Sequence, residues 1–368
     1  MDVAIVSIGT ANPAYMRNQT DTAELVSAGL NLKPSEKRLL KSVYKATGIE
    51  QRYSVLSDYC RIPGEFVFFP NDADTPFPST SERMRIYKEN ALTLALAAIK
   101  NCLESLTNFD NNDITHLITV SCTGLYAPGI DIEIVQQLQL RATTKRTAIN
   151  FMGCYGAFNA MKVAESICSA DNSANVLVVC VELCTIHFQK NSSLDNMISN
   201  AIFADGAAAV LINSNASHQK RLSFSSFYCD LIPHTQQEMA WQVGNFGFDI
   251  VLSAYVPEVI KSGIKEFTLR LLEKNQFNMN DIDFFAIHPG GLKILQACEE
   301  SLNITAEHNK YSYDVLSQYG NMSSATILFV LSKIWVALVP QDHQKNIFSC
   351  AFGPGLTLES MLLKINWL

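Results

Sequence analysis

The stretch Asn150-Phe151-Met152-Gly153-Cys154-Tyr155-Gly156-Ala157 decides the fold of this chain. Residues 147–152 have the pattern of a short buried strand, and residues 158–170 have the apolar spacing of a helix. Cys154 therefore stands at a strand-to-helix turn, at the positive end of the helix, where the thiolate is favoured. The flanking glycines permit a sharp turn and the close approach of a ligand. The same position also suits an inert core residue, because most free cysteines are buried and unreactive.

The composition is that of a large globular protein without a nucleic-acid or membrane signature. The chain has 368 residues, is 48% hydrophobic and carries a net charge of −7, with no long basic run. Its N-terminus lacks the basic region of a signal peptide, and the apolar run at residues 326–340 is too short to span a bilayer. The ten cysteines show no CxxC spacing and no cluster with histidine. We therefore expect a soluble cytoplasmic protein with reduced thiols and no metal site.

Four elements recur in the same order, and this repeat predicts the architecture. An Asn-Asp-Ile triplet leads twice into an apolar strand, which is followed by Cys122 in one case and by His288 in the other. The turn at Cys154 is matched, at nearly the same offset, by a turn at Asn321. Two later strands complete the match, residues 175–182 with 346–350 and residues 206–213 with 356–365. Chance explains any one similarity, but the shared order indicates an internal duplication.

The alternation of strands and helices predicts an α/β sheet architecture. We assign residues 1–217 to an N-terminal half that carries Cys154, and residues 218–368 to a C-terminal half that carries His288 and Asn321. Ligands of such sheets gather beyond the carboxyl ends of the strands. Because all three residues follow predicted strand ends, we expect them to meet at one site.

These three residues supply a nucleophile, a base and a hydrogen-bond donor. His288 is placed to hold Cys154 as a thiolate–imidazolium pair near neutral pH. The imidazole and the amide of Asn321 are then able to donate to one developing oxyanion. Taken singly, His288 also suits a structural histidine and Asn321 a turn residue.

Two chemistries use these residue types. In a cysteine protease the asparagine orients the histidine, and nothing in that function predicts a duplicated fold. In thioester chemistry Cys154 accepts an acyl group from coenzyme A, and a malonyl thioester is decarboxylated to an enolate that His288 and Asn321 stabilise. That enolate attacks the acyl-cysteine. The sequence signals no metal or redox cofactor for such a reaction.

Four short motifs, spread over nearly the whole chain, carry a family resemblance: Gly153-Cys154, Ala286-Ile287-His288-Pro289-Gly290-Gly291, Tyr319-Gly320-Asn321-Met322-Ser323-Ser324 and Ala351-Phe352-Gly353-Pro354-Gly355-Leu356-Thr357. Together they resemble the motifs of the type III polyketide synthases, the chalcone-synthase-like enzymes of the thiolase superfamily. Ala351 replaces the first glycine of the last motif. The resemblance implies a five-layered αβαβα fold built from two duplicated halves. It also implies a homodimer that uses acyl-CoA and malonyl-CoA as substrates and needs no cofactor.

The resemblance implies roles for further residues. Phe203 and Phe248 fall at the two phenylalanines that separate the coenzyme A tunnel from the reaction cavity. Substrate-binding positions match Cys122, Thr123, His187, Met239, Ser323, Gly353 and Pro354. Coenzyme A phosphates are expected on Lys293 and on the basic helix predicted at residues 34–45, through Arg38, Lys41 and Lys45. That basic run also suits a solvated helix face.

Departures from the plant pattern narrow the function. Cys122 replaces a threonine and suits an inert buried residue as well as a reactive one. His187 and Met239 replace smaller residues and remove cavity volume, whereas Ala127 replaces a methionine and restores some, so the sequence leaves the net volume open. We therefore expect a microbial-type synthase that extends an aliphatic starter with malonyl-CoA to an alkylpyrone, resorcinol, resorcylic acid or acylphloroglucinol. One alternative is a 3-oxoacyl-carrier-protein synthase III-like enzyme that makes a single condensation. Another is a catalytically silent homologue used for assembly.

Overall fold

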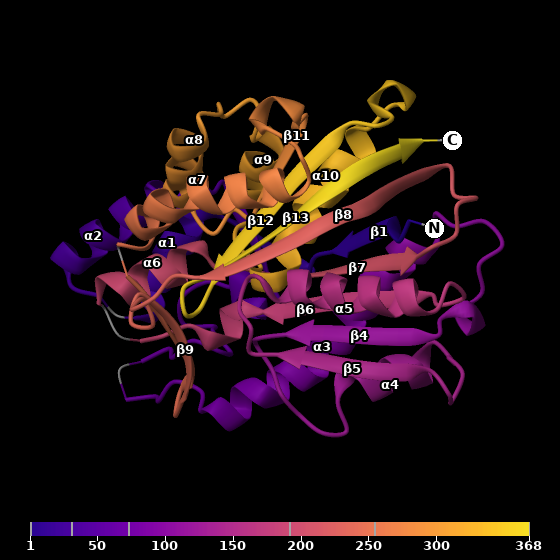
Figure 1. Cartoon of the computed structure of the whole chain (residues 1–368). Coiled ribbons are helices and arrows are strands. Elements are labelled where there is room, and N and C mark those ends of the chain that lie inside the picture. The colour runs from indigo at the N-terminus through magenta and orange to yellow at the C-terminus, as the bar shows by residue number, and fades with distance from the viewer. Residues whose placement is uncertain (1, 31, 73, 191–192, 254, 368) are drawn as a thin grey trace.

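The computed structural model describes residues 2–30, 32–72, 74–190, 193–253 and 255–367. Its centre is a nine-stranded sheet with the order β11-β12-β13-β8-β1-β7-β6-β4-β5 (Figure 1). The strands of this sheet are β1 (Ala4–Ala11), β4 (His116–Ser121), β5 (Lys145–Asn150), β6 (Val176–Leu183), β7 (Asp205–Asn213), β8 (Lys220–Leu231), β11 (Phe284–Ile287), β12 (Asn346–Gly353) and β13 (Thr357–Trp367). Two hairpins lie outside it, β2 (Tyr15–Asn18) with β3 (Gln51–Ser54), and β9 (Met239–Gly244) with β10 (Gly247–Leu252).

The pairing of the strands confirms the predicted duplication. In the first half β4 and β6 are parallel, β6 and β7 antiparallel, and β7 and β1 antiparallel. In the second half β11 and β12 are parallel, β12 and β13 antiparallel, and β13 and β8 antiparallel. The halves join where β1 pairs with β8, through Ala4 with Ser223 and Ile5 with Leu222. Within the described ranges β5 has no full counterpart, since the Asn321 turn makes one isolated bridge, to Phe203 of the first half.

Ten helices among the described residues complete the layers: α1 (Gln19–Gly29), α2 (Pro34–Lys45), α3 (Thr80–Leu103), α4 (Ile130–Gln137), α5 (Gly156–Ala170), α6 (Leu194–Ile202), α7 (Val256–Lys274), α8 (Leu292–Leu302), α9 (Lys310–Tyr319) and α10 (Thr326–Ala337). Figure 1 shows α5 across one face of β4 and β6, with α3 on the other. A first core packs α5 and α10 between strands of both halves, and two further cores lie under α3 and under α7 with α8. The result is the predicted αβαβα order of layers.

The apolar pattern of α10 explains its place in the middle layer. Residues 326–331 are buried without exception, so this helix has no solvent face over its first turns. A helix that is apolar on all sides is stable only when protein surrounds it. By contrast α2 carries cations over most of its surface, buries Leu40 and Tyr44, and lies on the outside of the molecule.

The strand before Cys154 differs from the prediction. Residues 147–152 were expected to form a buried strand, whereas β5 spans Lys145–Asn150 and is mostly exposed. The reason is topological, since β5 is the last strand of the sheet and pairs with β4 alone. The helix that follows begins at Gly156, two residues before the predicted start.

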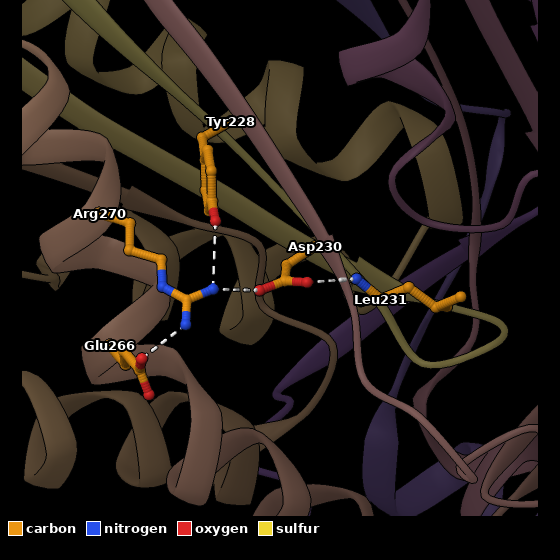
Figure 2. A network of polar contacts seen from close by, with 5 residues as sticks. All are labelled: Tyr228, Asp230, Leu231, Glu266 and Arg270. Atoms are coloured by element: carbon orange, nitrogen blue, oxygen red, sulfur yellow. Dashed lines mark hydrogen bonds and ion pairs between the residues drawn. The ribbon is translucent and has the colours of Figure 1, made fainter.

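A surface network fastens α7 to the end of β8 (Figure 2). The guanidinium of Arg270 donates to Asp230 at 3.2 Å and to Glu266 at 2.6 Å, and it reaches the hydroxyl of Tyr228 at 3.4 Å. Asp230 also accepts from the backbone N–H of Leu231 at 2.9 Å. The network therefore spans the outer helix layer and the sheet.

Candidate active site

The turn that carries Cys154 is held in shape by glycines on two different segments. Gly153 has a φ of +80°, and a Cβ there would lie 2.5 Å from Cδ of Pro354. A Cβ on Gly353 would lie 2.4 Å from the ring of Tyr155. The Gly353-Pro354 loop therefore packs directly on the Cys154 turn, and both glycines are required by this close approach.

Asn321 lies beside the sulfur of Cys154. Its amide oxygen is 3.9 Å and its amide nitrogen 4.0 Å from Sγ. The oxygen accepts from the backbone N–H of Ser323 at 2.9 Å, and the nitrogen donates to the carbonyl of Gly290 at 3.3 Å. These bonds fix the amide with its nitrogen toward the loop that carries His288.

His288 follows β11 directly and is 1% exposed. Its backbone N–H donates to the carbonyl of Cys350 at 2.8 Å, which continues the β11–β12 ladder. Neither ring nitrogen has a hydrogen-bond partner within the described part of the chain. Because a buried imidazole usually has both nitrogens satisfied, this ring is available to a ligand in the cavity.

The expected thiolate–imidazolium pair does not form between Cys154 and His288, because both groups are neutral in this site. Burial raises the pKa of the Cys154 thiol to about 12 and lowers the pKa of the His288 imidazole to about 3. Both groups are therefore neutral at pH 7. The physical reason is that burial disfavours each charged form and no hydrogen bond to the imidazole offsets it.

Glu182 is a central residue that the sequence argument missed. It ends β6 fully buried, and its carboxylate accepts from the backbone N–H of Cys122 at 2.9 Å and the hydroxyl of Thr123 at 2.8 Å. The hydroxyl of Ser324 donates to its other oxygen. Burial raises the pKa of Glu182 to about 7. Glu182 thus joins the loop after β4 to the Asn321 turn, and a lone acid ending a wholly apolar strand was the available signal.

Cys122 is a supporting residue of the Cys154 turn. Its sulfur accepts from the backbone N–H of Gly153 at 3.0 Å, and the indole of Trp241 donates to its carbonyl at 2.8 Å. Burial raises the pKa of the Cys122 thiol. Trp241, in the β9–β10 hairpin, was not predicted, because no sequence pattern marked that hairpin.

The reaction cavity encloses only about 40 Å³ in this structure. The side chains expected there that do line it are Cys122, Thr123, Cys154, Phe203, Met239, His288, Asn321, Ser323 and Pro354. Gly353 supports the cavity from behind through its contact with Tyr155. A space of this size holds two or three water molecules, so a bound acyl chain requires side chains to move.

Phe248 and His187 lie in a neighbouring cavity and do not line the reaction cavity. Their rings stack at 4.2 Å between centroids. His187 accepts from the backbone N–H of Phe248 at 2.9 Å, and its other nitrogen lies 2.7 Å from the carbonyl of Thr123. Burial lowers the pKa of His187 to about 3, so the ring is neutral. It therefore donates to Thr123 and accepts from Phe248.

A second opening, the outer cavity, leads toward the reaction cavity. It encloses about 270 Å³ between α2, α6, the start of α7 and the start of α8. Leu252, Gly290 and Ile294 line both cavities. The outer cavity and the reaction cavity therefore adjoin at these three residues.

Of the four predicted coenzyme A cations, the structure brings only Lys293 to the wall of the outer cavity. The α2 residues on that wall include Val43, while Arg38, Lys41 and Lys45 are absent from it. At 100° per residue they lie on other sides of the helix, and Lys41 pairs with Glu24 of α1. Their role in binding the phosphates of coenzyme A stays a prediction.

Along the described ranges, no helix combines the length and apolarity needed to cross a bilayer.

Sequence comparison matches both parts of the chain to one family. The family model described as "Chalcone and stilbene synthases, N-terminal domain" matches residues 2–216, and the corresponding C-terminal domain matches residues 223–366. "Alpha-pyrone synthesis polyketide synthase-like Pks18" of Mycobacterium tuberculosis is 32% identical over 99% of this chain and 91% of its own length. "Probable polyketide synthase 1" of Dictyostelium discoideum is 30% identical over 98% of this chain, which corresponds to 11% of that protein.

Solved structures show the same fold at similar identity. The C-terminal type III polyketide synthase domain of Steely1 from Dictyostelium superposes with a TM-score of 0.90 at 28% identity, covering 100% of both chains. PKS-I from the brown alga Ectocarpus siliculosus superposes with a TM-score of 0.88 at 28% identity, covering 99% of this chain and 98% of that one.

Proposed function

Because the chain belongs to the chalcone and stilbene synthase family, the type III polyketide synthases, we propose that it loads an acyl-CoA starter on Cys154 and extends it with malonyl-CoA. The observation that carries this proposal is the meeting of Cys154, His288 and Asn321 at one cavity. Coenzyme A thioesters are the substrates, and the reaction uses no further cofactor.

Loading begins when the thioester enters through the outer cavity. His288, whose ring nitrogens have no partner among the described residues, takes the thiol proton of Cys154. The thiolate attacks the acyl carbonyl, and coenzyme A leaves as its thiol with that proton. The acyl group is then held as a thioester on Cys154.

In the extension step, His288 and Asn321 act as hydrogen-bond donors to the thioester oxygen of malonyl-CoA. The thioester carbonyl of malonyl-CoA accepts from His288 and from the amide nitrogen of Asn321, which its bond to Gly290 already orients. The bond to the malonyl carboxylate breaks, CO₂ leaves, and the electron pair forms an enolate. The enolate carbon attacks the acyl-cysteine carbonyl and expels the Cys154 thiolate, so each round lengthens the chain by one ketide unit.

An α-pyrone is the product class we favour among alkylpyrones, resorcinols, resorcylic acids and acylphloroglucinols. The name of the mycobacterial relative states α-pyrone synthesis. An α-pyrone forms when an enol oxygen attacks the thioester carbonyl, which requires no additional catalytic group.

We also propose that the enzyme is a homodimer in the cytoplasm. The strand before Cys154 has the sequence of a buried strand, yet β5 is an exposed edge in one copy of the chain. Edge strands of this kind are covered in native proteins, and a second copy supplies a cover.

The test is incubation with malonyl-CoA and a panel of acyl-CoA starters, followed by mass spectrometry of products and of the intact enzyme. We expect an acyl adduct on Cys154 and products from two or more extensions. Products of a single condensation only would exclude the polyketide assignment in favour of a 3-oxoacyl-carrier-protein synthase III-like enzyme.

Variants of Cys154 and Asn321 test which residue holds the acyl group and which one stabilises the enolate. Cys154→Ala removes the adduct, while Cys60→Ala, at an exposed cysteine, retains it. Asn321→Ala lowers malonyl-CoA decarboxylation by about 10²–10³, the usual loss for one oxyanion donor. Full activity of Asn321→Ala, or an adduct on the Cys154→Ala protein, would contradict the assignment.

A further inference from the structure

A second small cavity lies behind the reaction cavity. It encloses about 30 Å³. Four residues line both cavities and form the partition between them: Cys184, Phe203, Trp241 and Ile250. A single layer of side chains therefore separates the site at Cys154 from this second space.

The second cavity contains buried hydrogen-bond donors that have no acceptor. Arg52 is 1% exposed and lines the cavity, and its Nη2 has no partner among the described residues. Ser199 also lines it, is 3% exposed, and its hydroxyl has no partner there either. Leaving such groups unpaired is costly, so they call for an acceptor.

The hydrogen-bond partners of Arg52 among the described residues include no carboxylate. Its Nε donates to Gln19 at 2.9 Å and its Nη1 to the carbonyl of Asn200 at 2.9 Å and that of Phe203. All of these acceptors are neutral, and no salt bridge involving Arg52 occurs within the described ranges. A buried guanidinium with a free N–H selects an anionic acceptor above a neutral one.

Trp241 is an aromatic residue of the partition and lies outside the nine-stranded sheet. It belongs to the β9–β10 hairpin, which lies outside the nine-stranded sheet. Its indole makes one hydrogen bond, to the carbonyl of Cys122, and packs edge-on against His187 and Phe248 at 5.9 and 6.0 Å between centroids. Phe203, in contrast, is held through its backbone by Arg52 and by its bridge to Asn321.

We propose that the second cavity is a distal subsite for the starter acyl group and that it takes a carboxylate at the far end of the chain. The proposal rests on the function proposed above and names its substrate class. Nη2 of Arg52 and the hydroxyl of Ser199 donate to the carboxylate, and Trp241 turns aside to let the chain pass. The space suits a group of two or three heavy atoms, because it holds about two waters, and it is too small for an alkyl tail.

Pairs of starters that differ only at the far end test the proposal. Binding to the Cys154→Ala protein is measured by calorimetry for succinyl-CoA against butyryl-CoA, adipoyl-CoA against hexanoyl-CoA, and suberoyl-CoA against octanoyl-CoA. Acylation of Cys154 in the natural protein is followed with the same pairs. We expect the carboxylated member to bind and react about tenfold better or more at one length, as for a hydrogen bond to a charged group.

Two variants locate the effect. Ser199→Ala removes a hydroxyl that holds no other described group, and it reduces the preference for the carboxylated member severalfold. Trp241→Ala opens the partition and extends the preference to longer pairs. Ser27→Ala is the matched control, because Ser27 is equally buried with an unpartnered hydroxyl but lies on α1, and it leaves the preference unchanged.

The outcomes separate the two proposals. Equal or weaker binding of the carboxylated member at every length would overturn the distal subsite and indicate that ordered waters satisfy Arg52 and Ser199. A preference unaffected by Ser199→Ala would overturn the assignment to this cavity. Absence of any adduct on Cys154 would overturn the proposed function, while the calorimetric comparison still decides the subsite.

Discussion

Cys154 and His288 are both neutral at pH 7, because burial disfavours the charged form of each side chain. The thiol has its pKa raised to about 12 and the imidazole has its pKa lowered to about 3. Because thiol reagents and oxidants attack the thiolate, we expect Cys154 to react slowly with them at neutral pH.

The rate of alkylation of Cys154 tests this state. With a pKa of about 12, the thiolate fraction rises about tenfold for each pH unit up to pH 10, so the rate with iodoacetamide rises without a plateau. Peptide mass spectrometry measures the rate, with the exposed Cys60 as a reference in the same digests. A plateau below pH 8 would instead indicate a preformed thiolate–imidazolium pair.

Gly153 is required for both conformation and space. Gly153→Ala places a Cβ against Pro354 at a position with φ of +80°, and we expect slower acylation of Cys154 because the turn shifts. Gly64→Ala is the matched control, since Gly64 has φ of +96° with open space around its Cβ. Each substitution costs about 1–2 kcal/mol in free energy of unfolding. Equal acylation rates in the two variants would refute a special role for the Gly153–Pro354 contact.

At the scale of elements, an ion pair joins the middle helix layer to the second half of the sheet. Lys162 of α5 contacts Glu359 of β13 at 2.7 Å, and the Glu359 side chain is 4% exposed. Glu359 has no other described partner for its second oxygen. The pair therefore sets how α5, which follows Cys154, sits against the strand that follows the Gly353-Pro354 loop.

Lys162→Met is expected to lower the free energy of unfolding at pH 7 by about 1–3 kcal/mol, because it leaves a buried carboxylate unpaired. Burial raises the pKa of Glu359 above its ordinary value. The folded state then binds a proton more readily than the unfolded chain, so the deficit grows as pH rises above about 4.5 and shrinks below it. Denaturant unfolding across pH measures it.

Arg270→Met is the surface control for that experiment. The pair of Arg270 with Asp230 also joins a helix to a strand, but both side chains are more than two-fifths exposed (Figure 2). Exposed pairs contribute little, so the unfolding midpoint should stay unchanged. A deficit as large as that of Lys162→Met would show that linking the layers matters more than burial.

The order of elements was predictable because the duplication leaves a pattern in the sequence. The helix at residues 34–45 was placed correctly, and Cys154, Asn321 and His288 were correctly expected to meet. The β9–β10 hairpin was not foreseen, because its residues alternate weakly and pair only with each other. Trp241 and the separation of Phe248 from the reaction cavity were missed for that reason.

The directions of side chains on an exposed helix could not be predicted from the sequence either. The basic residues of α2 were recognised, but Arg38, Lys41 and Lys45 face away from the outer cavity. Which side of a helix faces a ligand depends on packing partners, here Leu40 and Tyr44, and these were not identified in advance. Glu182 was likewise assigned to a strand, but its three hydrogen-bond donors were not foreseen, because they come from turns that are distant in the sequence.

At the scale of the whole molecule, the exposed edge at β5 predicts self-association. Ala148→Glu places a charge in the middle of that exposed strand, and we expect it to convert a dimer to a monomer in light scattering after size-exclusion chromatography. Ala306→Glu, at an exposed position far along the chain, should leave the dimer intact. A natural protein that is monomeric at micromolar concentration would contradict the dimer proposal.

The pairing of β1 also determines how the chain reaches its native state. Ala4 pairs with Asn213 and with Ser223, so β1 has no strand partner until β7 and β8, much later in the sequence, have been synthesised. At 5–20 residues per second this delay is roughly 10–40 s. Val3, Ile5 and Ile8, buried in the native core, remain unpaired during that interval. Long-range pairing of this kind slows folding and exposes the nascent chain to aggregation, so we expect the apolar face of β1 to need protection until β7 has been made.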